Sequence, residues 1–544
     1  MKKNSFLEGA FFATFSIFLC KILGLLYVIP FYGLIGDKGG ALYSYAYSIY
    51  SIFLSLSTVG IPLAMSRLVS EYNELGYDKT KKKLFSLSKK IILLLGVTFF
   101  VIIMVFAPQI AYLMIGNVDG GNTIAEVSMA IRVVGTALLV VPSLSVTRGY
   151  LNGHKFISVT GASEVIEQLI RVIVIVGGSF VVIKVLNLPP NIAVYISVFG
   201  ATVGAFSSLL YLRGKISNNN LEDNKSDNAE PEITAKELIK KMFLYALPFV
   251  IIALVREAYG MVDSFTVIKA MDKLGYDIAV SEKVFGVLAT WASKLNMIVA
   301  SVALGLVTSL IPNISGSVAR KDYEEVNYKI NQAFQSLLFI VLPMAIGISF
   351  LAQPVWTVFY GYDQISVSIF KFYILQSIIF CVYTVSLNLA QSMGKTKIAL
   401  GGLFFSFIFK VIFNSPAMYL FKFMGIEAYY APIIVNIIAQ GIATIVILII
   451  LKKQYKFNYK LIAQNLLKTM VSIIIMLVSL SLLKIFIPLD TTNRMLAIVI
   501  ILIYTIWGIA IYYIVSKKTK LVDTILGDNF IEKLLKKIKK GENK

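Results

Sequence analysis

The run IILLLGVTFFVIIMVFAPQIAYLMI, residues 91–115, contains no charged side chain. The hydrocarbon core of a bilayer is about 30 Å thick, and an α-helix needs about 20 residues to cross it. Lipid offers the backbone no hydrogen-bond partner, so a chain that crosses it must satisfy its own amide groups. This run therefore predicts a membrane-spanning helix.

Comparable apolar runs recur along the whole chain. Of the 544 residues, 57% are hydrophobic and 15% are charged, and the mean hydropathy is +0.78. These values leave too little polar surface for a water-soluble protein of this length. We predict an all-α integral membrane protein with about fourteen transmembrane helices. The predicted spans are residues 8–35, 41–65, 91–115, 126–147, 158–185, 192–212, 243–268, 284–311, 332–352, 366–392, 398–422, 429–451, 465–487 and 495–515.

The segments between the spans alternate between basic and nearly uncharged. Alternate sides of the membrane receive about 35 and about 5 Lys and Arg residues, and the positive-inside rule places the richer side in the cytoplasm. Both termini then lie in the cytoplasm. The basic loops also account for most of the net charge of +21. That charge indicates contact with anionic membrane lipids rather than with nucleic acid.

Two short patterns occur twice, six spans apart. Gly60-Ile61-Pro62 is echoed by Leu310-Ile311-Pro312, and the segment 150–156 is echoed by 390–397. An even number of spans preserves orientation, so the pattern predicts two pseudo-symmetric six-helix lobes with a site between them. The predicted parts are an N-terminal lobe (1–214), a cytoplasmic linker (215–237), a C-terminal lobe (238–452), two additional helices (453–516) and a basic amphipathic cytoplasmic tail (517–544).

Charged residues inside the spans are mostly cations. A charge at the membrane centre costs about 2.5–3.5 kcal/mol on insertion scales, so such residues indicate a functional site or a buried partner. Lys184, Lys422, Lys468 and Lys484 lie near span ends and are predicted to reach the headgroups, and Lys371 stays undecided. The predicted substrate-binding cations are Lys21, Arg132, Arg171, Arg256, Lys294 and Lys410. The acids are Glu164, Glu167, Glu257 and Asp263.

Two interpretations of these charges stay open. Glu164 or Glu167 with Arg171, and Glu257 with Arg256, could be internal ion pairs that hold helices together. Alternatively, the excess of cations forms a hydrated positive cavity for a phosphate-bearing substrate, and the acids serve ion coupling.

Enzyme chemistry is the least favoured interpretation. The sequence has no nucleotide-binding loop and no nucleophile-base arrangement. Cys20 and Cys381 fall within spans and predict no disulfide and no metal site. His154, the single histidine, is predicted to be a solvated loop residue. We expect no cofactor.

Five motifs resemble a known family. Residues 20–24 (CKILG), 27–30 (YVIP), 60–62 (GIP), 66–73 (SRLVSEYN) and 148–154 (RGYLNGH) are similar to the SpoVB/YtgP branch of the multidrug/oligosaccharidyl-lipid/polysaccharide (MOP) exporter superfamily, which is related to the MurJ lipid II flippases. The likeness covers nearly the whole chain and includes fourteen spans.

The resemblance implies a flippase in the bacterial plasma membrane. Its substrate would be an undecaprenyl-pyrophosphate-linked cell-wall precursor, lipid II in the first instance, moved from the inner to the outer leaflet by alternating access. Lys21 stands where MurJ-type sequences carry a basic residue before Leu-Gly. Tyr27 stands where they carry a second arginine, so the headgroup contacts must differ.

Three rival functions remain at this stage. They are a flippase for another lipid-linked polysaccharide precursor, a drug or cation antiporter of the same superfamily, and a non-transporting scaffold that recruits cell-wall synthesis enzymes. Antiporters typically have twelve spans and use membrane acids, whereas the first span here carries Lys21 and no mid-span acid. Transport would be coupled to Na+, H+ or the membrane potential, and a monomer is expected.

Overall fold

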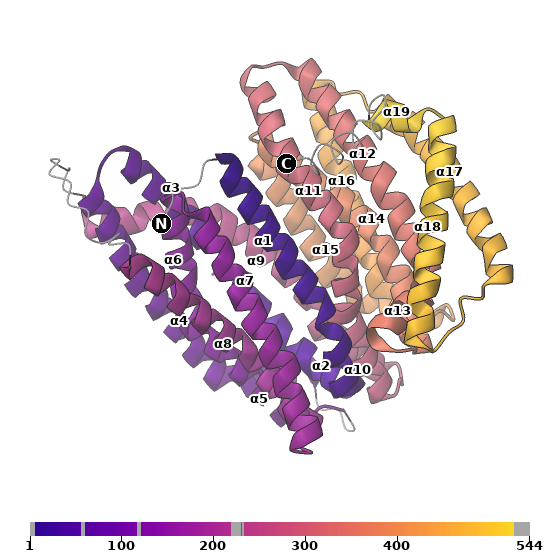
Figure 1. Ribbon diagram of the computed structural model, residues 1–544, viewed down its shortest axis with the longest axis horizontal. Helices are drawn as coiled ribbons and strands as arrows, with labels where there is room; N and C mark the ends of the chain where they lie inside the picture. Colours follow the sequence, from indigo (N-terminus) through magenta and orange to yellow (C-terminus); the bar gives the residue numbers. More distant parts are fainter. Residues whose placement is uncertain (1–5, 56–59, 117–120, 219–229, 231–232, 527–544) are drawn as a thin grey trace, which may run out of the picture. The chain divides into compact units, whose positions relative to one another are not determined.

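The computed structural model describes residues 6–55, 60–116, 121–218, 230 and 233–526. The described residues form helices and no β-strand (Figure 1). The chain divides into two compact units, Met1–Thr290 and Trp291–Lys544. The first contains α1 (Phe6–Leu26), α2 (Val28–Ser55), α3 (Ile61–Glu74), α4 (Asp78–Ile115), α5 (Ile124–Gly135), α6 (Val141–Gly153), α7 (Ile157–Ile173), α8 (Pro190–Ser217), α9 (Ala235–Lys273) and α10 (Ile278–Gly286). The second contains α11 (Ala292–Ala319), α12 (Tyr323–Phe350), α13 (Ala352–Tyr360), α14 (Gln364–Ser392), α15 (Thr396–Phe423), α16 (Ala431–Tyr455), α17 (Lys460–Phe486), α18 (Arg494–Lys518) and α19 (Leu521–Leu526).

The predicted membrane fold is confirmed. Among the described residues, 12 helices are long and apolar enough to cross a bilayer, and up to 13 if the bent pair α1 and α2 counts as one span. These two helices meet at an angle of 45°. The α2 helix is itself interrupted at Gly36, whose φ is 64°. A residue with a Cβ rarely adopts this conformation. The interruption lies between the predicted spans 8–35 and 41–65.

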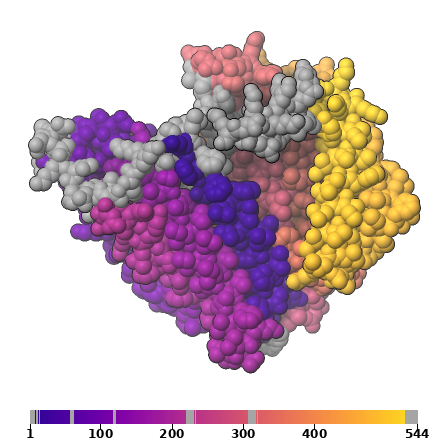
Figure 2. All heavy atoms as spheres, in the orientation of Figure 1, coloured from indigo at the N-terminus to yellow at the C-terminus, as the bar shows by residue number. Residues whose placement is uncertain are grey.

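In the first unit, small residues allow helices to approach closely. Gly149 of α6 lies against Pro62 of α3, and Gly153 lies one turn further along against Val69. Gly161 of α7 lies against Ser16 of α1, and Figure 2 shows α1 running along α7. Such contacts are the usual basis of helix association in lipid, where apolar burial gives little advantage.

The predicted linker touches the start of α4. Of residues 215–237, the structure describes 215–218, 230 and 233–237. The Glu230 carboxylate accepts hydrogen bonds from the backbone N–H groups of Lys79 (2.7 Å) and Thr80 (2.8 Å). Burial raises the pKa of Glu230, but these bonds outweigh it and lower the pKa overall. A carboxylate suits a helix N-terminus, where N–H groups lack partners.

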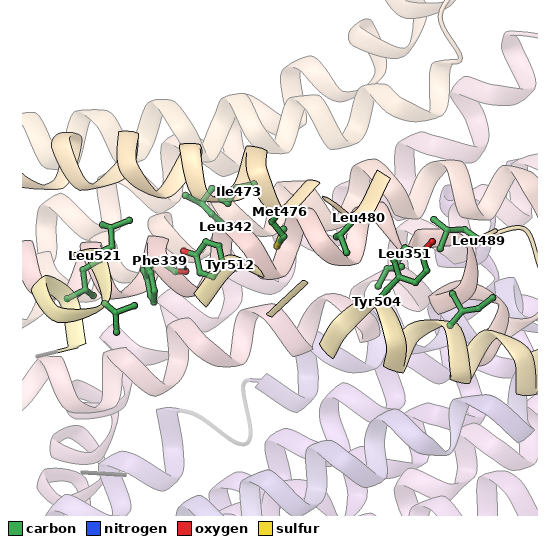
Figure 3. Packing of buried hydrophobic residues seen from close by; sticks show 13 residues of the cluster. Phe339, Leu342, Leu351, Ile473, Met476, Leu480, Leu489, Tyr504, Tyr512 and Leu521 are labelled. Carbon is green, nitrogen blue, oxygen red and sulfur yellow. Dashed lines mark hydrogen bonds between the residues drawn. The ribbon is translucent and has the colours of Figure 1, made fainter. Parts of the chain in front are cut away.

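In the second unit, α12, α17, α18 and α19 share an apolar core (Figure 3). The Tyr512 hydroxyl donates to the backbone oxygen of Phe339 (2.8 Å), which satisfies the polar end of a buried ring. Leu521 and Ile525 belong to the predicted amphipathic tail. They are 0% and 5% exposed and pack in this core. The rest of the tail, residues 527–544, lies outside the described residues.

His154 is also placed differently from the prediction. It is 6% exposed, and its ring lies 4.6 Å from the Tyr150 ring and 6.1 Å from the Phe156 ring, measured between centroids. The prediction of a solvated loop residue was wrong, because the short turn after α6 folds back on the helix and buries its side chains.

The crossing of α3 and α6 yields a stability prediction. A Cβ at Gly149 would lie 2.7 Å from the Pro62 backbone oxygen and 2.9 Å from its Cα. We expect Gly149→Ala to lower the free energy of unfolding by about 1–3 kcal/mol, measured by detergent-induced unfolding of the purified protein. Gly401→Ala is the control, because no atom lies within 4 Å of the new Cβ in α15. Equal stability of the two variants would contradict the close-packing argument.

Candidate functional site

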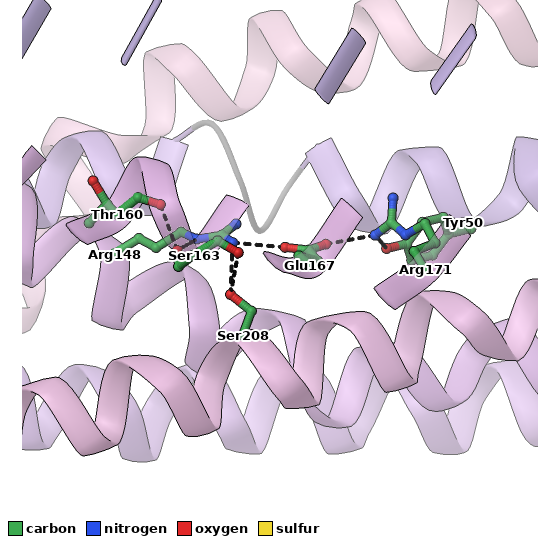
Figure 4. A network of polar contacts seen from close by, with 7 residues as sticks. All are labelled: Tyr50, Arg148, Thr160, Ser163, Glu167, Arg171 and Ser208. Atoms are coloured by element: carbon green, nitrogen blue, oxygen red, sulfur yellow. Dashed lines mark hydrogen bonds and ion pairs between the residues drawn. The ribbon is translucent and has the colours of Figure 1, made fainter. Parts of the chain in front are cut away.

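One face of α7 carries a row of polar side chains. Ser163, Glu167 and Arg171 are spaced four residues apart and therefore lie on the same side of the helix. An Arg171 terminal nitrogen donates to one Glu167 carboxylate oxygen at 2.6 Å. Arg148 of α6 donates to the other oxygen at 2.9 Å. A single carboxylate thus joins two arginines (Figure 4).

Arg148 is fixed by two further hydrogen bonds. Its Nε donates to the Ser163 hydroxyl (2.9 Å), and a terminal nitrogen donates to the Ser208 hydroxyl of α8 (3.0 Å). The Ser208 hydroxyl in turn donates to the backbone oxygen of Ser163 (2.8 Å). The side chains of Arg148, Glu167 and Arg171 are only 13%, 12% and 16% exposed. The network therefore links α6, α7 and α8 inside the first unit.

Sequence reasoning missed Arg148. The predicted fourth span ends at residue 147 and leaves Arg148 outside the membrane. In the structure α6 continues to Gly153, so Arg148 lies on a helix and its side chain bonds to residues of α7. The place of Arg148 at the start of the RGYLNGH motif is the signal that the sequence offers.

Tyrosines of the first unit lie near Arg171, at one end of this network. Arg171 donates to the Tyr50 hydroxyl of α2 at 3.4 Å. Tyr43 and Tyr47 are further electrostatic neighbours of Arg171, and their rings stack with centroids 5.7 Å apart. The Tyr27 and Tyr43 hydroxyls share a hydrogen bond of 3.1 Å. The tyrosines add hydroxyl donors and acceptors beside the guanidinium.

The α1 helix covers a second side of α7. Glu164 and Glu167 of α7 lie close enough to Cys20 to act on it electrostatically. Gly24 lies against the Gln168 side chain. Glu164 is half-buried and forms no ion pair within the part of the chain that the structure describes. Lys21, the adjacent residue to Cys20, is likewise half-buried and unpaired among the described residues.

The other predicted residues of the first unit are dispersed. Arg132 of α5 donates from Nε to the Met104 backbone oxygen (3.2 Å). Arg256 of α9 is exposed, and its neighbour Glu257 is half-buried. Asp263 of α9 is 7% exposed. Of the two predicted ion pairs, the described residues contain Glu167 with Arg171 but not Glu257 with Arg256.

The second unit holds Lys294 and Lys410. Lys294 is half-buried on α11. Lys410 is 1% exposed and lies on α15 between Ser406 (1%) and Asn414 (0%), one turn away on either side. Among the described residues, no group of three His, Cys, Asp or Glu side chains could hold a metal ion.

Comparisons with known proteins agree on one family. Residues 6–318 match a family model described as polysaccharide biosynthesis protein. The chain is 31% identical over 536 residues to the lipid II flippase MurJ of Bacillus subtilis (strain 168), and the match covers 96% of this chain and 97% of that protein. The chain belongs to the MurJ family of polysaccharide biosynthesis proteins.

Solved structures of two transporters have a fold similar to that of this MurJ family member. The lipid II flippase MurJ in an inward closed conformation is similar with a TM-score of 0.67 at 18% identity, covering 93% of this chain and 98% of that one. An inward-facing MATE transporter of the MOP superfamily gives 0.65 at 13% identity, covering 80% and 94%. The predicted resemblance is confirmed, and so is the prediction of a multi-pass transporter rather than an enzyme.

The shared carboxylate predicts a large effect of losing one arginine. Arg148→Ala leaves Glu167 with one partner and Ser163 and Ser208 without their donor, so we expect a loss of about 3–5 kcal/mol of unfolding free energy. Arg320→Ala removes an arginine that is 62% exposed from its ion pair with Glu325, and we expect a loss of about 0–1 kcal/mol. Detergent-induced unfolding measures both. A similar loss in both variants would show that the α6–α7 network adds no special stability.

Proposed function

We propose that this chain is a flippase that moves an undecaprenyl-pyrophosphate-linked cell-wall precursor, lipid II in the first instance, from the inner to the outer leaflet by alternating access. The observation that carries the proposal is the 31% identity to lipid II flippase MurJ along 96% of this chain and 97% of that protein. The match spans the entire transport fold, so it does not depend on a shared fragment.

The intramembrane cations support an anionic substrate. Lys21, Arg171 and Arg256 lie in the first unit and Lys294 and Lys410 in the second. Guanidinium and ammonium groups form charge-assisted hydrogen bonds with phosphoryl oxygens, and the guanidinium fork matches two oxygens at once. We propose these residues, together with Arg132, as contacts for the pyrophosphate.

We propose the bacterial plasma membrane as the location, with both termini and the basic loops in the cytoplasm. The loop charges support this orientation, and they suit contact with anionic lipid headgroups. The proposal also assigns residues 1–214 and 238–452 to two six-helix lobes that move against one another. A monomer can perform this task, and cell-wall synthesis enzymes are natural partners.

Ion coupling would supply the energy, through Na+, H+ or the membrane potential. Glu164, Glu257 and Asp263 are the proposed coupling acids, since Glu167 already neutralises part of the charge of two arginines. A charge that crosses the membrane gains about 2.3 kcal/mol per 100 mV.

Two observations favour alternative functions. The family description, polysaccharide biosynthesis protein, favours a different lipid-linked polysaccharide precursor as substrate. The similarity of fold to a MATE transporter favours a drug or cation antiporter. In a depletion strain, accumulation of inner-leaflet lipid II would support the first proposal, whereas unchanged lipids with altered drug resistance would support the antiporter.

Complementation tests the role of the cations. We expect Lys21→Ala and Arg256→Ala each to abolish growth in cells that depend on this chain as their lipid II flippase, because each removes a cation from inside a span. Lys422→Ala should grow normally, since this exposed residue near the end of α15 is predicted to reach the headgroups. Colony counts and inner-leaflet lipid II are measured at matched protein levels. Normal growth of both the Lys21→Ala and the Arg256→Ala variants would refute the cationic-site proposal.

A further inference from the structure

Glu167 holds Arg171 in a defined orientation. One carboxylate oxygen accepts from Arg171 and the other from Arg148. Arg148 is itself bonded to Ser163 and Ser208, so a rotation of the carboxylate would break its bonds to Arg171 on α7 and to Arg148 on α6. A buried guanidinium held in this way loses little conformational entropy when it binds a further acceptor.

Arg171 retains a donor that this network does not use. Its Nε is buried and has no hydrogen-bond partner among the described residues. A buried N–H group without a partner is destabilising, so its presence indicates a ligand or a functional role. The hydroxyl of Tyr50 lies beside the same guanidinium, and Tyr47 and Tyr43 are near it.

The backbone changes geometry next to Arg171. After α7 ends at Ile173, residues Val174–Gly178 form a π-helical turn. Such turns inside membrane or soluble helices occur frequently at functional sites. This turn begins three residues after Arg171.

We propose that Glu167 is a positioning residue that aims Arg171 at a phosphoryl oxygen of the transported lipid. The inference rests on the proposed function and adds a specific group to it: Arg171 and the Tyr50 hydroxyl contact the phosphate, while Glu167 and Arg148 set their geometry without touching it. A carboxylate seated between two guanidiniums also lowers their net charge, which allows the phosphate to be released after transport.

Binding of lipids by the full-length protein in detergent tests the proposal. The three ligands are undecaprenyl pyrophosphate, phosphatidylglycerol and uncharged undecaprenol. We expect Glu167→Gln to weaken binding of undecaprenyl pyrophosphate about tenfold or more, because the misdirected guanidinium loses a charge-assisted hydrogen bond to the phosphate. Undecaprenol binding should not change, because it carries no phosphate. If Glu167 had a purely structural role, the substitution would weaken the binding of undecaprenyl pyrophosphate and of undecaprenol equally.

Glu325→Gln is the matched control. Glu325 also accepts from two cations, Arg320 (2.5 Å) and Lys329 (2.8 Å), but it lies at the exposed start of α12. We expect its lipid binding to equal that of the wild type. Glu167→Asp keeps the charge and should restore part of the pyrophosphate selectivity.

The outcomes separate this inference from the flippase proposal. An unchanged ratio of pyrophosphate to undecaprenol affinity in folded Glu167→Gln overturns the positioning role. If that variant does not fold, Ser208→Ala is measured in its place, since it removes one hydrogen bond from Arg148. A ratio of pyrophosphate to undecaprenol affinity about threefold below that of the wild type supports the role, and an unchanged ratio overturns it. An equal loss for phosphatidylglycerol supports the positioning role and shows that Arg171 contacts a phosphate group common to both lipids. Wild-type binding without lipid II flipping would refute the flippase proposal alone.

Discussion

A charged side chain inside a membrane span must have its charge compensated, because the surrounding lipid supplies neither water nor counter-ions. The first unit meets this requirement with the carboxylate of Glu167, which is shared by Arg148 and Arg171. The hydroxyls of Ser163 and Ser208 complete the arrangement. The relative placement of α6, α7 and α8 depends on these bonds, since any sliding of one helix would separate charges in a medium of low dielectric constant.

Close helix packing accompanies the shared carboxylate. Arg148 is followed at once by Gly149, whose missing side chain lets α6 approach Pro62 of α3. A Cβ at Gly204 of α8 would lie 2.7 Å from the Glu167 backbone oxygen, so this glycine allows α8 to approach α7 at the network itself. Residues that allow close packing and residues that compensate charge therefore lie next to one another in the same helices.

Most of the fold could be predicted from the sequence, because hydropathy reports directly on whether a helix can lie in lipid. The interruption at Gly36 also falls between two predicted spans. The errors came from features that depend on tertiary contacts. Hydropathy ended the fourth span before Arg148, and it had no means to show that a carboxylate on α7 compensates this arginine. The periodicity of the tail did not reveal that Leu521 packs on protein rather than on lipid.

The buried cations of the two units have different neighbours on their own helices. In α7 the acids Glu164 and Glu167 accompany Arg171, whereas α15, which carries Lys410, contains no acidic residue. Lys410 is 1% exposed, and Ser406 and Asn414 lie one turn away on either side. An ion pair within one helix fixes the direction of a guanidinium. The direction of Arg171 is therefore set within α7 itself, whereas any acid that compensates Lys410 must come from outside α15.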